Sequence, residues 1–414
     1  MKHRLTTILL FAVLAFQFTS CKQDEEAVLG SLELTITLAE TYATFDTKGV
    51  EVVLTNTTDN SVFKATIVEA GKIFFNDLAP GTYSASASKK LTAEQAFPFT
   101  GLNKEVTLNA LKADIVILPK EAKTETIILD GKTGGSLIIK EIYSVGAAND
   151  GYAILFKDQF IEIYNNSEEV QYVDGLYLAY LAPQRAGSDP TKEIVTTLPI
   201  NTFVYASKIL QFPGTGNQYP IQPGKAMRIA VNAVNYLASK PAAYTTDNSK
   251  ADFDTYAIDW LVANGRTGNT TFDIDNPNVP TMKCIYLFVQ KGGFFNMDNA
   301  ASLALLKLDT DPAIPANTIL DPDITTSQLY YVKLPSASII DGVDVLETSS
   351  ANVYKRLPSS VDAGFTYVNA LGKSNYSGKS IRRKTSLTLT NGRKVLMDTN
   401  NSGNDFEAEL VTIH

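Results

Sequence analysis

The stretch SLELTITL, residues 31–38, alternates strictly between apolar and polar side chains. Successive side chains of a β-strand point to opposite faces, so this period of two predicts a strand with one buried and one solvent-facing side. The buried side would carry Leu32, Leu34, Ile36 and Leu38. The folded chain is therefore expected to begin with a β-sheet that packs on one face.

Short segments of the same chemistry follow this strand. Residues 50–55, 62–67, 73–76, 83–87, 105–108 and 113–118 are predicted strands, and turn formers such as Pro80-Gly81 separate them. About seven short strands in so short a region are typical of a β-sandwich. The stretch GKIFFNDLAPGTYSASAS, residues 71–88, resembles prealbumin-like and carboxypeptidase-regulatory-like domains. This resemblance implies an Ig-like or prealbumin-like sandwich over residues 31–118 that serves as a spacer.

A second region follows a predicted connector at residues 119–135, which contains one more strand. It opens with SLIIKEIYSVG at 136–146 and DQFIEIYNNSEEVQYVDGLYLAYL at 158–181. This region resembles the lamin-tail domain, an immunoglobulin-like sandwich. The resemblance lies in the order of a strand with a glutamate inside it, an Asn-Asn-Ser turn and a further strand. The predicted fold class is therefore all-β, with two β-sandwich modules. The second module, residues 136–414, would be lamin-tail-like and enlarged by short helical and loop insertions.

The N-terminus has the pattern of an export signal. A basic start precedes an apolar run at residues 8–18, which is shorter than the roughly 20 residues that a membrane-spanning helix needs. The small residues Thr19 and Ser20 before Cys21 resemble the lipobox of bacterial lipoproteins. The resemblance implies that residues 1–20 are a cleaved signal peptide and that Cys21 carries fatty-acyl chains such as palmitate. Such chains bind a bilayer strongly, because each buried methylene contributes about 0.8 kcal/mol.

An acidic segment directly follows the lipidation position. The sequence KQDEE at residues 22–26, within a predicted tether at 21–30, resembles the signal that Bacteroidota-type lipoproteins use to reach the outer face of the outer membrane. A solvated, extended tether is the alternative interpretation, and both can hold together. We therefore expect a lipid-anchored, surface-exposed protein of the outer membrane.

Charge and residue counts exclude several function classes. The formal net charge is −8, the wrong sign for a nucleic-acid partner. Lipidation of Cys21 would leave Cys284 alone, so no intrachain disulfide is expected. The only histidines are His3, in the signal peptide, and His414, at the C-terminus. Histidine-based catalytic triads and metal clusters are therefore not expected.

Two glutamates in the second region suggest an acid pair. Glu141 and Glu162 could perform general acid and base chemistry if both faced one pocket. However, Glu162 alternates with Ile161 and Ile163, which favours a side chain that faces solvent or binds loop amides. The second interpretation is preferred, and no catalytic residue is predicted.

Other polar motifs also have structural explanations. DIDN at residues 273–276 offers oxygen ligands, but it lacks the glycine and the final acid of an EF-hand, so a loop held by Asx turns is expected. No metal site or cofactor is predicted. In the run RRK at 382–384, alternation exposes Arg382 and Lys384 together; a surface pair is preferred over an anion site. The loop DTNNSGNDF at 398–406 should close compactly and bury Phe406.

Four apolar residues complete the candidates. Cys284 lies in a strand that is apolar on both faces, which predicts a buried, inert thiol. Phe294 and Phe295 follow a glycine pair and form a candidate contact patch for a ligand or partner. Trp260 lies in YAIDWLVANG, a predicted short helix, where core packing is the preferred role.

Several blocks together resemble one uncharacterised family of Bacteroidota-type surface lipoproteins, which joins a prealbumin-like module to a lamin-tail-like one. The blocks are IAVNAVNYL (229–237), ADFDTY (251–256), DIDNPNVPTM (273–282), SIIDGVDVL (338–346), VDAGFTYV (361–368), GKSIRRK (378–384) and DTNNSGNDFE (398–407). The family has no assigned reaction. The resemblance implies an accessory of a TonB-dependent outer-membrane transporter.

We therefore expect a non-catalytic lipoprotein that binds a nutrient ligand or an outer-membrane transporter and assists uptake. The alternative is an adhesion or scaffold lipoprotein that presents loops to host or matrix proteins. No enzyme activity and no nucleic-acid partner are expected.

Overall fold

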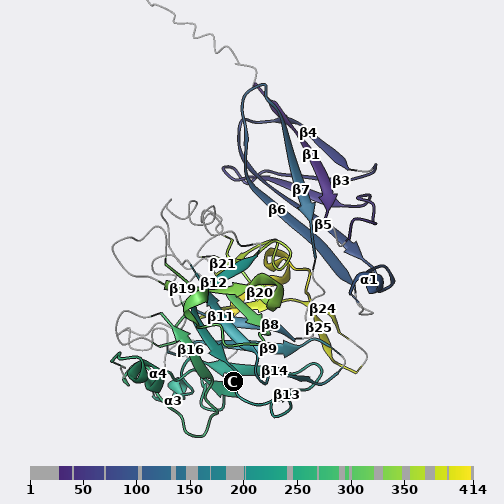
Figure 1. Cartoon of the computed structure of the whole chain (residues 1–414). Coiled ribbons are helices and arrows are strands. Elements are labelled where there is room, and N and C mark those ends of the chain that lie inside the picture. Colours follow the sequence, from purple (N-terminus) through teal and green to yellow (C-terminus); the bar gives the residue numbers. More distant parts are fainter. Residues whose placement is uncertain are drawn as a thin grey trace, which may run out of the picture.

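The computed structural model describes residues 28–39, 42–69, 71–100, 105–131, 137–145, 157–167, 169–182, 200, 202–239, 246–267, 270–288, 294–297, 301–320, 330–346, 355–368, 378–388 and 391–411. Figure 1 shows two units, an N-terminal one in purple and blue and a larger C-terminal one in teal to yellow. Each unit has its own hydrophobic core.

Two facing sheets form the N-terminal unit. The β1 sheet has the strand order β4-β1-β7, and the β5 sheet has the order β3-β2-β5-β6. The strands are β1 (Gly30–Leu38), β2 (Glu51–Asn56), β3 (Val62–Thr66), β4 (Lys72–Leu78), β5 (Gly81–Leu91), β6 (Val106–Ile117) and β7 (Ala122–Leu129). Leu32, Leu34 and Ile36 of β1 are buried in the core between the sheets, as the alternation predicts. Leu38 packs against that core but is only partly buried.

The predicted boundary at residue 118 is too early. Strand β7 lies inside the predicted connector, yet it pairs in parallel with β1 from Ser31–Ala122 to Leu38–Leu129. Its Ile127 and Leu129 belong to the same core as β1. The N-terminal sandwich therefore includes residues 122–129 of the predicted connector, which form an edge strand of the β1 sheet and contribute to its core.

Two further features of this unit differ from the predictions. The expected strands at 105–108 and 113–118 are one strand, β6, whose register with β5 shifts between Tyr83 and Ala85. Helix α1 (Ala93–Thr100) was not foreseen. It begins with a capping box, in which Gln95 N–H donates to Thr92 Oγ1 and Thr92 N–H donates to Gln95 Oε1. This Thr-x-x-Gln spacing is a signal that the sequence does carry.

Two larger sheets form the C-terminal unit. The β8 sheet has the order β15-β14-β9-β8-β23-β26, and the β12 sheet has the order β18-β19-β12-β11-β17-β20, with β16 also paired to β12. The β8 sheet contains β8 (Leu137–Tyr143), β9 (Phe160–Asn165), β14 (Ala226–Ala230), β15 (Phe253–Asp254), β23 (Lys379–Arg383) and β26 (Phe406–Leu410). The β12 sheet contains β11 (Tyr177–Leu181), β12 (Phe203–Gln211), β16 (Lys283–Leu287), β17 (Leu303–Leu306), β18 (Thr318–Leu320), β19 (Tyr330–Pro335) and β20 (Ile339–Val343).

The main core lies between these two sheets. Ile139 and Ile161 of the β8 sheet share it with Leu178 and Leu210 of the β12 sheet. A second apolar cluster, which includes Ala179, covers the opposite face of the β12 sheet. Both faces of this sheet are therefore buried, which explains its nearly continuous apolar strands. The predicted all-β sandwich fold class is confirmed.

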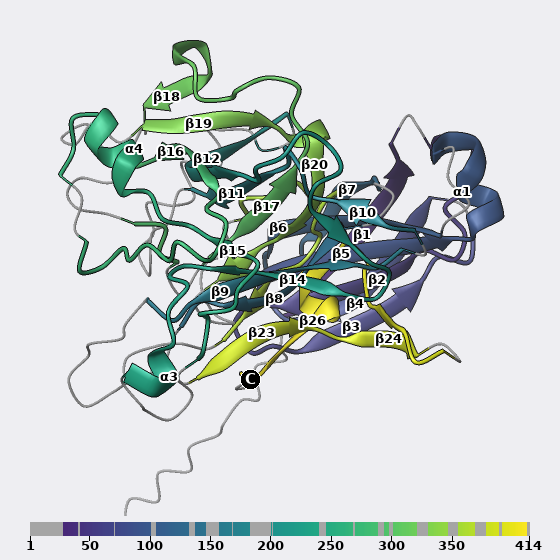
Figure 2. The same ribbon diagram turned by 90° about the horizontal axis from the view of Figure 1, so that it is seen from below.

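Smaller elements decorate the C-terminal unit. Three short strand pairs are β10 (Gln171–Tyr172) with β13 (Pro220–Ile221), β21 (Val345–Leu346) with β22 (Thr366–Tyr367), and β24 (Thr385–Thr388) with β25 (Lys394–Leu396). The helical segments are α3 (Tyr236–Ser239), α4 (Ile258–Ala263), α5 (Ser402–Asp405), η2 (Pro315–Asn317) and η3 (Ser336–Ser338). Figure 2 shows α3 and α4 on the side of the molecule away from α1.

Polar contacts join the two units. Asn109 Nδ2 of β6 donates to the Thr399 carbonyl, and Asn400 Nδ2 donates to the Thr107 carbonyl at 3.4 Å. The loop that precedes α5 therefore packs against β6 of the N-terminal sandwich.

Candidate functional site

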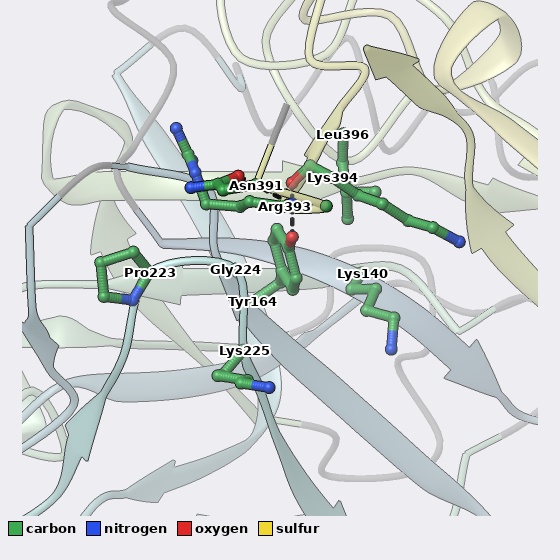
Figure 3. A pocket seen from close by; sticks show the side chains of 10 residues that line it. Lys140, Tyr164, Pro223, Gly224, Lys225, Asn391, Arg393, Lys394 and Leu396 are labelled. Carbon is green, nitrogen blue, oxygen red and sulfur yellow. Dashed lines mark hydrogen bonds between the residues drawn. The ribbon is translucent and has the colours of Figure 1, made fainter. Parts of the chain in front are cut away.

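A pocket of about 660 Å³ lies beside the β24–β25 hairpin, on the side of the β8 sheet that faces away from the β12 sheet (Figure 3). Ligand pockets in proteins typically enclose about 300 to 1,000 Å³. We call it the basic pocket. Its lining residues are Lys140, Tyr164, Pro223, Gly224, Lys225, Asn391, Gly392, Arg393, Lys394 and Leu396.

Two glycine turns shape the walls of the pocket. Gly224 and Gly392 both have positive φ, at 74° and 82°, which glycine adopts without strain. A Cβ on Gly224 would lie 2.6 Å from Arg393 Cγ, so only glycine lets the hairpin approach this closely. Asn391 and Gly392 lie in the connection between β24 and β25, and Asn391 Oδ1 accepts from Arg393 N–H at 3.0 Å.

Hydrogen bonds hold the hairpin over strand β9. Tyr164 Oη donates to the Lys394 carbonyl at 2.5 Å. The Asn166 side chain pairs with the backbone of Leu396, accepting from its N–H at 2.8 Å and donating to its carbonyl at 3.1 Å. Arg393 Nη1 donates to the Ser167 carbonyl at 3.1 Å. These bonds fix the outer wall of the pocket relative to its floor.

The charge of the described lining is positive. Among the lining residues that the structure describes, four are basic and none is acidic. Lys140 is paired with Glu162 at 2.5 Å, and Glu162 is also held by Arg228 at 2.8 Å. Burial alone would raise the pKa of Glu162, but the two cations outweigh it and lower the pKa. Lys225 and Lys394 are exposed and form no ion pair within the described part of the chain.

The predicted acid pair has a structural role. Glu141 and Glu162 are directly opposite each other on β8 and β9, and both are buried. Arg382 Nη2 binds Glu141 at 3.0 Å, and Ser380 Oγ donates to the same carboxylate at 2.6 Å. Ion pairs therefore engage both carboxylates. The preferred expectation that Glu162 faces solvent or binds loop amides is wrong, because its cations bury it.

The basic run at 382–384 splits between two environments. Arg382 and Lys384 lie on the outer side, where Arg382 binds Glu141 and Glu409, as the alternation predicts. Arg383 points into the protein and is fully enclosed. Its guanidinium contacts three carboxylates, those of Asp341, Asp398 and Asp405, at 3.0, 3.2 and 3.4 Å. The alternation of residues 382–384 does not reveal this buried centre, although the acid-rich loop at 398–407 could have indicated a partner for Arg383.

The loop at 398–406 behaves as predicted. Phe406 is buried in the main core, and its ring lies 4.6 Å from the Arg383 guanidinium carbon. Asn401 caps α5 by accepting from Asn404 N–H. The loop is thus a structural closure of the C-terminal unit.

The DIDN segment forms a hydrogen-bonded loop, as expected. Asp273 Oδ2 accepts from Ala257 N–H at 2.8 Å, and Asn276 Nδ2 donates to the Ala233 carbonyl at 2.8 Å. Burial, followed by the charges of Asp254 and Asp275, raises the pKa of Asp273 to about 7. Within the described residues, no group of three or more His, Cys, Asp or Glu side chains is placed to hold a metal.

The predicted aromatic contact patch does not form. Phe294 and Phe295 are both buried in the main core, and Phe295 lies edge-on to Tyr180 with ring centroids 6.3 Å apart. Core packing explains these two rings, so the expectation of an exposed patch is corrected. Trp260 packs against the same core, as predicted.

The two cysteines differ in what the structure describes. Cys284 is a buried free thiol, as predicted, and burial followed by the charge of Asp273 raises its pKa to about 12. Cys21, the predicted lipidation position, lies outside the described residues. Among the described residues no helix is long and apolar enough to cross a membrane.

Comparison with known proteins supports the expected family resemblance. Residues 222–413 match the model of a family described as "Protein of unknown function (DUF4876)". This matched segment contains every lining residue of the basic pocket except Lys140 and Tyr164. No curated protein matches the chain.

Solved structures give the same picture of the fold. A crystal structure of a DUF4876 family protein from Bacteroides thetaiotaomicron is similar with a TM-score of 0.58 and 24% identity, covering 93% of this chain and 96% of that chain. A putative carbohydrate binding protein from Bacteroides uniformis matches at 10% identity over 49% of this chain and 98% of that chain, with a TM-score of 0.17. The first similarity supports the fold, and the second is too low to support an argument. The predicted likeness to an uncharacterised Bacteroidota-type family is confirmed to this extent, whereas the lipid anchor and the transporter remain predictions.

Proposed function

We propose that this protein is a non-catalytic lipoprotein of the outer-membrane surface, which holds a nutrient ligand in the basic pocket and assists its uptake through a TonB-dependent transporter. The observation that supports binding is the pocket itself. Its volume suits a small molecule, and the bonds of Tyr164 and Asn166 make its walls rigid. A preformed site avoids much of the ordering cost of binding.

The architecture suits a role at a distance from a bilayer. Because β1 and β7 are parallel, Gly30 lies at one end of the N-terminal unit and Leu129, which leads into the C-terminal unit, lies at the other. A lipid on Cys21 would attach near Gly30. The nine residues of β1 span roughly 30 Å at about 3.3 Å per residue. The N-terminal sandwich would thus hold the basic pocket away from the membrane.

The engaged carboxylates support a non-catalytic role. A glycan hydrolase needs two carboxyl groups that are free to exchange protons with a substrate. Glu141 and Glu162 are instead bound to Arg382, Lys140 and Arg228 and buried beneath them. Binding and presentation of a ligand therefore agree better with this arrangement than acid–base chemistry does.

The proposal is tested in the producing bacterium with the full chain carrying a C-terminal tag. Mass spectrometry of the purified protein should find acyl chains on Cys21, and protease treatment of intact cells should digest the protein. Extraction in mild detergent should recover a β-barrel transporter with it. A Cys21→Ala chain should lose both surface exposure and the transporter.

Two outcomes would contradict the proposal. An unmodified Cys21 thiol in the wild-type protein would overturn the location. The adhesion function would be favoured instead by two results together. The lipoprotein would be recovered without a transporter, and a deletion strain would take up nutrients normally but lose adherence.

A further inference from the structure

We propose that the ligand of the basic pocket is a small molecule with at least two oxyanion groups, which are carboxylates, sulfates or phosphates. This inference rests on the proposed function, because it names the chemical class that the same pocket would bind. The observation that carries it is that the described lining residues include four cations and no acid. Charge-assisted hydrogen bonds to oxyanions are the strongest contacts that such a lining offers.

Two of the four cations of the lining, Lys225 and Lys394, carry a positive charge that no described acid compensates. Lys140 shares Glu162 with Arg228, so that carboxylate faces two cations at 2.5 and 2.8 Å. Arg393 donates to the backbone carbonyls of Asn166 and Ser167 and is engaged in further contacts, so it is not one of the available cations. Lys225 and Lys394 have no ion-pair partner in the described part of the chain.

The cations come from separate walls, which favours more than one oxyanion. Lys225 follows the Pro223-Gly224 turn that leads into β14, whereas Lys394 begins β25 on the hairpin. In Figure 3 the ammonium groups of Lys140 and Lys394 both lie to the right of the Tyr164 ring, and Lys225 lies below it. A ligand with one charge would leave part of this lining without a counterion.

The rest of the molecule makes this local charge unusual. The whole chain has a formal charge of −8, so an anion is repelled by most of the surface. A concave site of opposite sign then selects where the anion binds and speeds its encounter. The overall charge also argues against a nucleic-acid chain, which would extend beyond the pocket onto acidic surface.

The experiment measures calorimetric binding of defined probes to the full lipidated chain in a neutral detergent. The probes are digalacturonic acid with two carboxylates, glucuronic acid with one, neutral cellobiose, and glycerophosphoglycerol as the headgroup of an anionic lipid. Digalacturonic acid should bind tightest, and its Kd should rise with salt. Glycerophosphoglycerol carries only one phosphate, so stronger binding of this probe would overturn the requirement for two oxyanions and would favour a lipid headgroup as the ligand.

A charge-matched pair of variants locates the site. The double variant Lys225→Gln/Lys394→Gln should weaken binding of digalacturonic acid by at least about tenfold, because it removes two charge-assisted contacts. A tenfold change corresponds to about 1.4 kcal/mol. The control Lys64→Gln/Lys120→Gln removes two exposed lysines of the N-terminal unit and should change Kd by less than about twofold.

Each result has a distinct meaning. If cellobiose and digalacturonic acid bind equally and the pocket variant weakens both, the proposal that the ligand is anionic is overturned. The pocket would still be a binding site. Equal effects of the two double variants would overturn the pocket as the site. Absence of binding by every charged probe would overturn the inference, whereas transporter recovery would still decide the proposed function.

Discussion

Replacement of the buried Arg383 by methionine tests the reasoning about the C-terminal unit most directly. The guanidinium is almost fully enclosed and lies between the carboxylates of Asp341, Asp398 and Asp405. It also donates to the carbonyls of Ile139 and Met397 at 3.0 Å. The change Arg383→Met keeps much of the side-chain volume but leaves three buried carboxylates without their cation.

The expected loss in unfolding free energy is about 3 to 5 kcal/mol at pH 8, the usual result of removing one partner of a buried ion pair. The loss should shrink at lower pH. Burial raises the pKa of Asp341 to about 7 and that of Asp405 to about 6, although Arg383 opposes both shifts. Without Arg383 these pKa values would rise further.

The sign of the pH effect follows from linkage. An acid whose pKa is higher in the folded than in the unfolded state binds its proton more tightly when folded, so it stabilises the fold as pH falls from 7 toward 4. The protonated carboxyls also no longer need a cation. We therefore expect the difference between Arg383→Met and wild type to fall by about 1 to 2 kcal/mol between pH 8 and pH 5.5.

Trp260 provides the assay, because it is the only tryptophan of the chain and packs against the core of the C-terminal unit. Urea unfolding followed by its fluorescence reports that unit alone. The control is Arg266→Met, an exposed arginine after α4, which should change stability by less than about 0.5 kcal/mol. A loss below about 1 kcal/mol at pH 8, or a loss that grows as pH falls, would refute the reasoning.

Three further predictions concern other buried groups. The pKa of Asp273 is raised to about 7, and its Oδ1 has no hydrogen-bond partner in the described structure, so wild-type stability should decline between pH 5 and pH 7.5. The change Asp273→Asn should flatten this decline in thermal melts. An unchanged slope would argue against a charged, buried Asp273. Phe295→Ala should cost about 3 to 5 kcal/mol in urea unfolding, because it removes a fully buried ring beside Tyr180, and a cost under about 1 kcal/mol would place that ring outside the core. The Cys284 thiol, whose pKa burial raises to about 12, should resist a thiol-reactive dye at pH 8 and react in denaturing urea; fast reaction of the folded protein would contradict its burial.

Local patterns predicted much of the fold because they depend on neighbouring residues. The alternation in β1 needs only the period of two, and the buried face it predicts holds Leu32, Leu34 and Ile36. Cys284 and Phe406 were placed correctly by the same logic. Strand β7 was misassigned to a connector, since its pairing with β1 joins residues about ninety positions apart.

The candidate site could not be predicted in this way. The basic pocket joins Lys140, Tyr164, the turn at 223–225 and the hairpin at 391–396, and no window of sequence contains them all. Phe294 and Phe295 illustrate the converse error. Two adjacent aromatics after glycines suggested exposure, but the neighbouring sheets cover both rings.

The sequence by itself determined that the chain is all-β, that its N-terminus has an export pattern, and that histidine chemistry is almost absent. Those properties follow from composition and short-range periodicity. Only the tertiary structure decided which charges are neutralised and which remain available. Glu162 was expected at the surface but is buried under Lys140 and Arg228. Lys225 and Lys394 instead line a pocket whose described residues include no acid. The physical reason is that the free energy of a charge depends on its distance to other charges and to water, and strand pairing sets those distances between residues far apart in the chain.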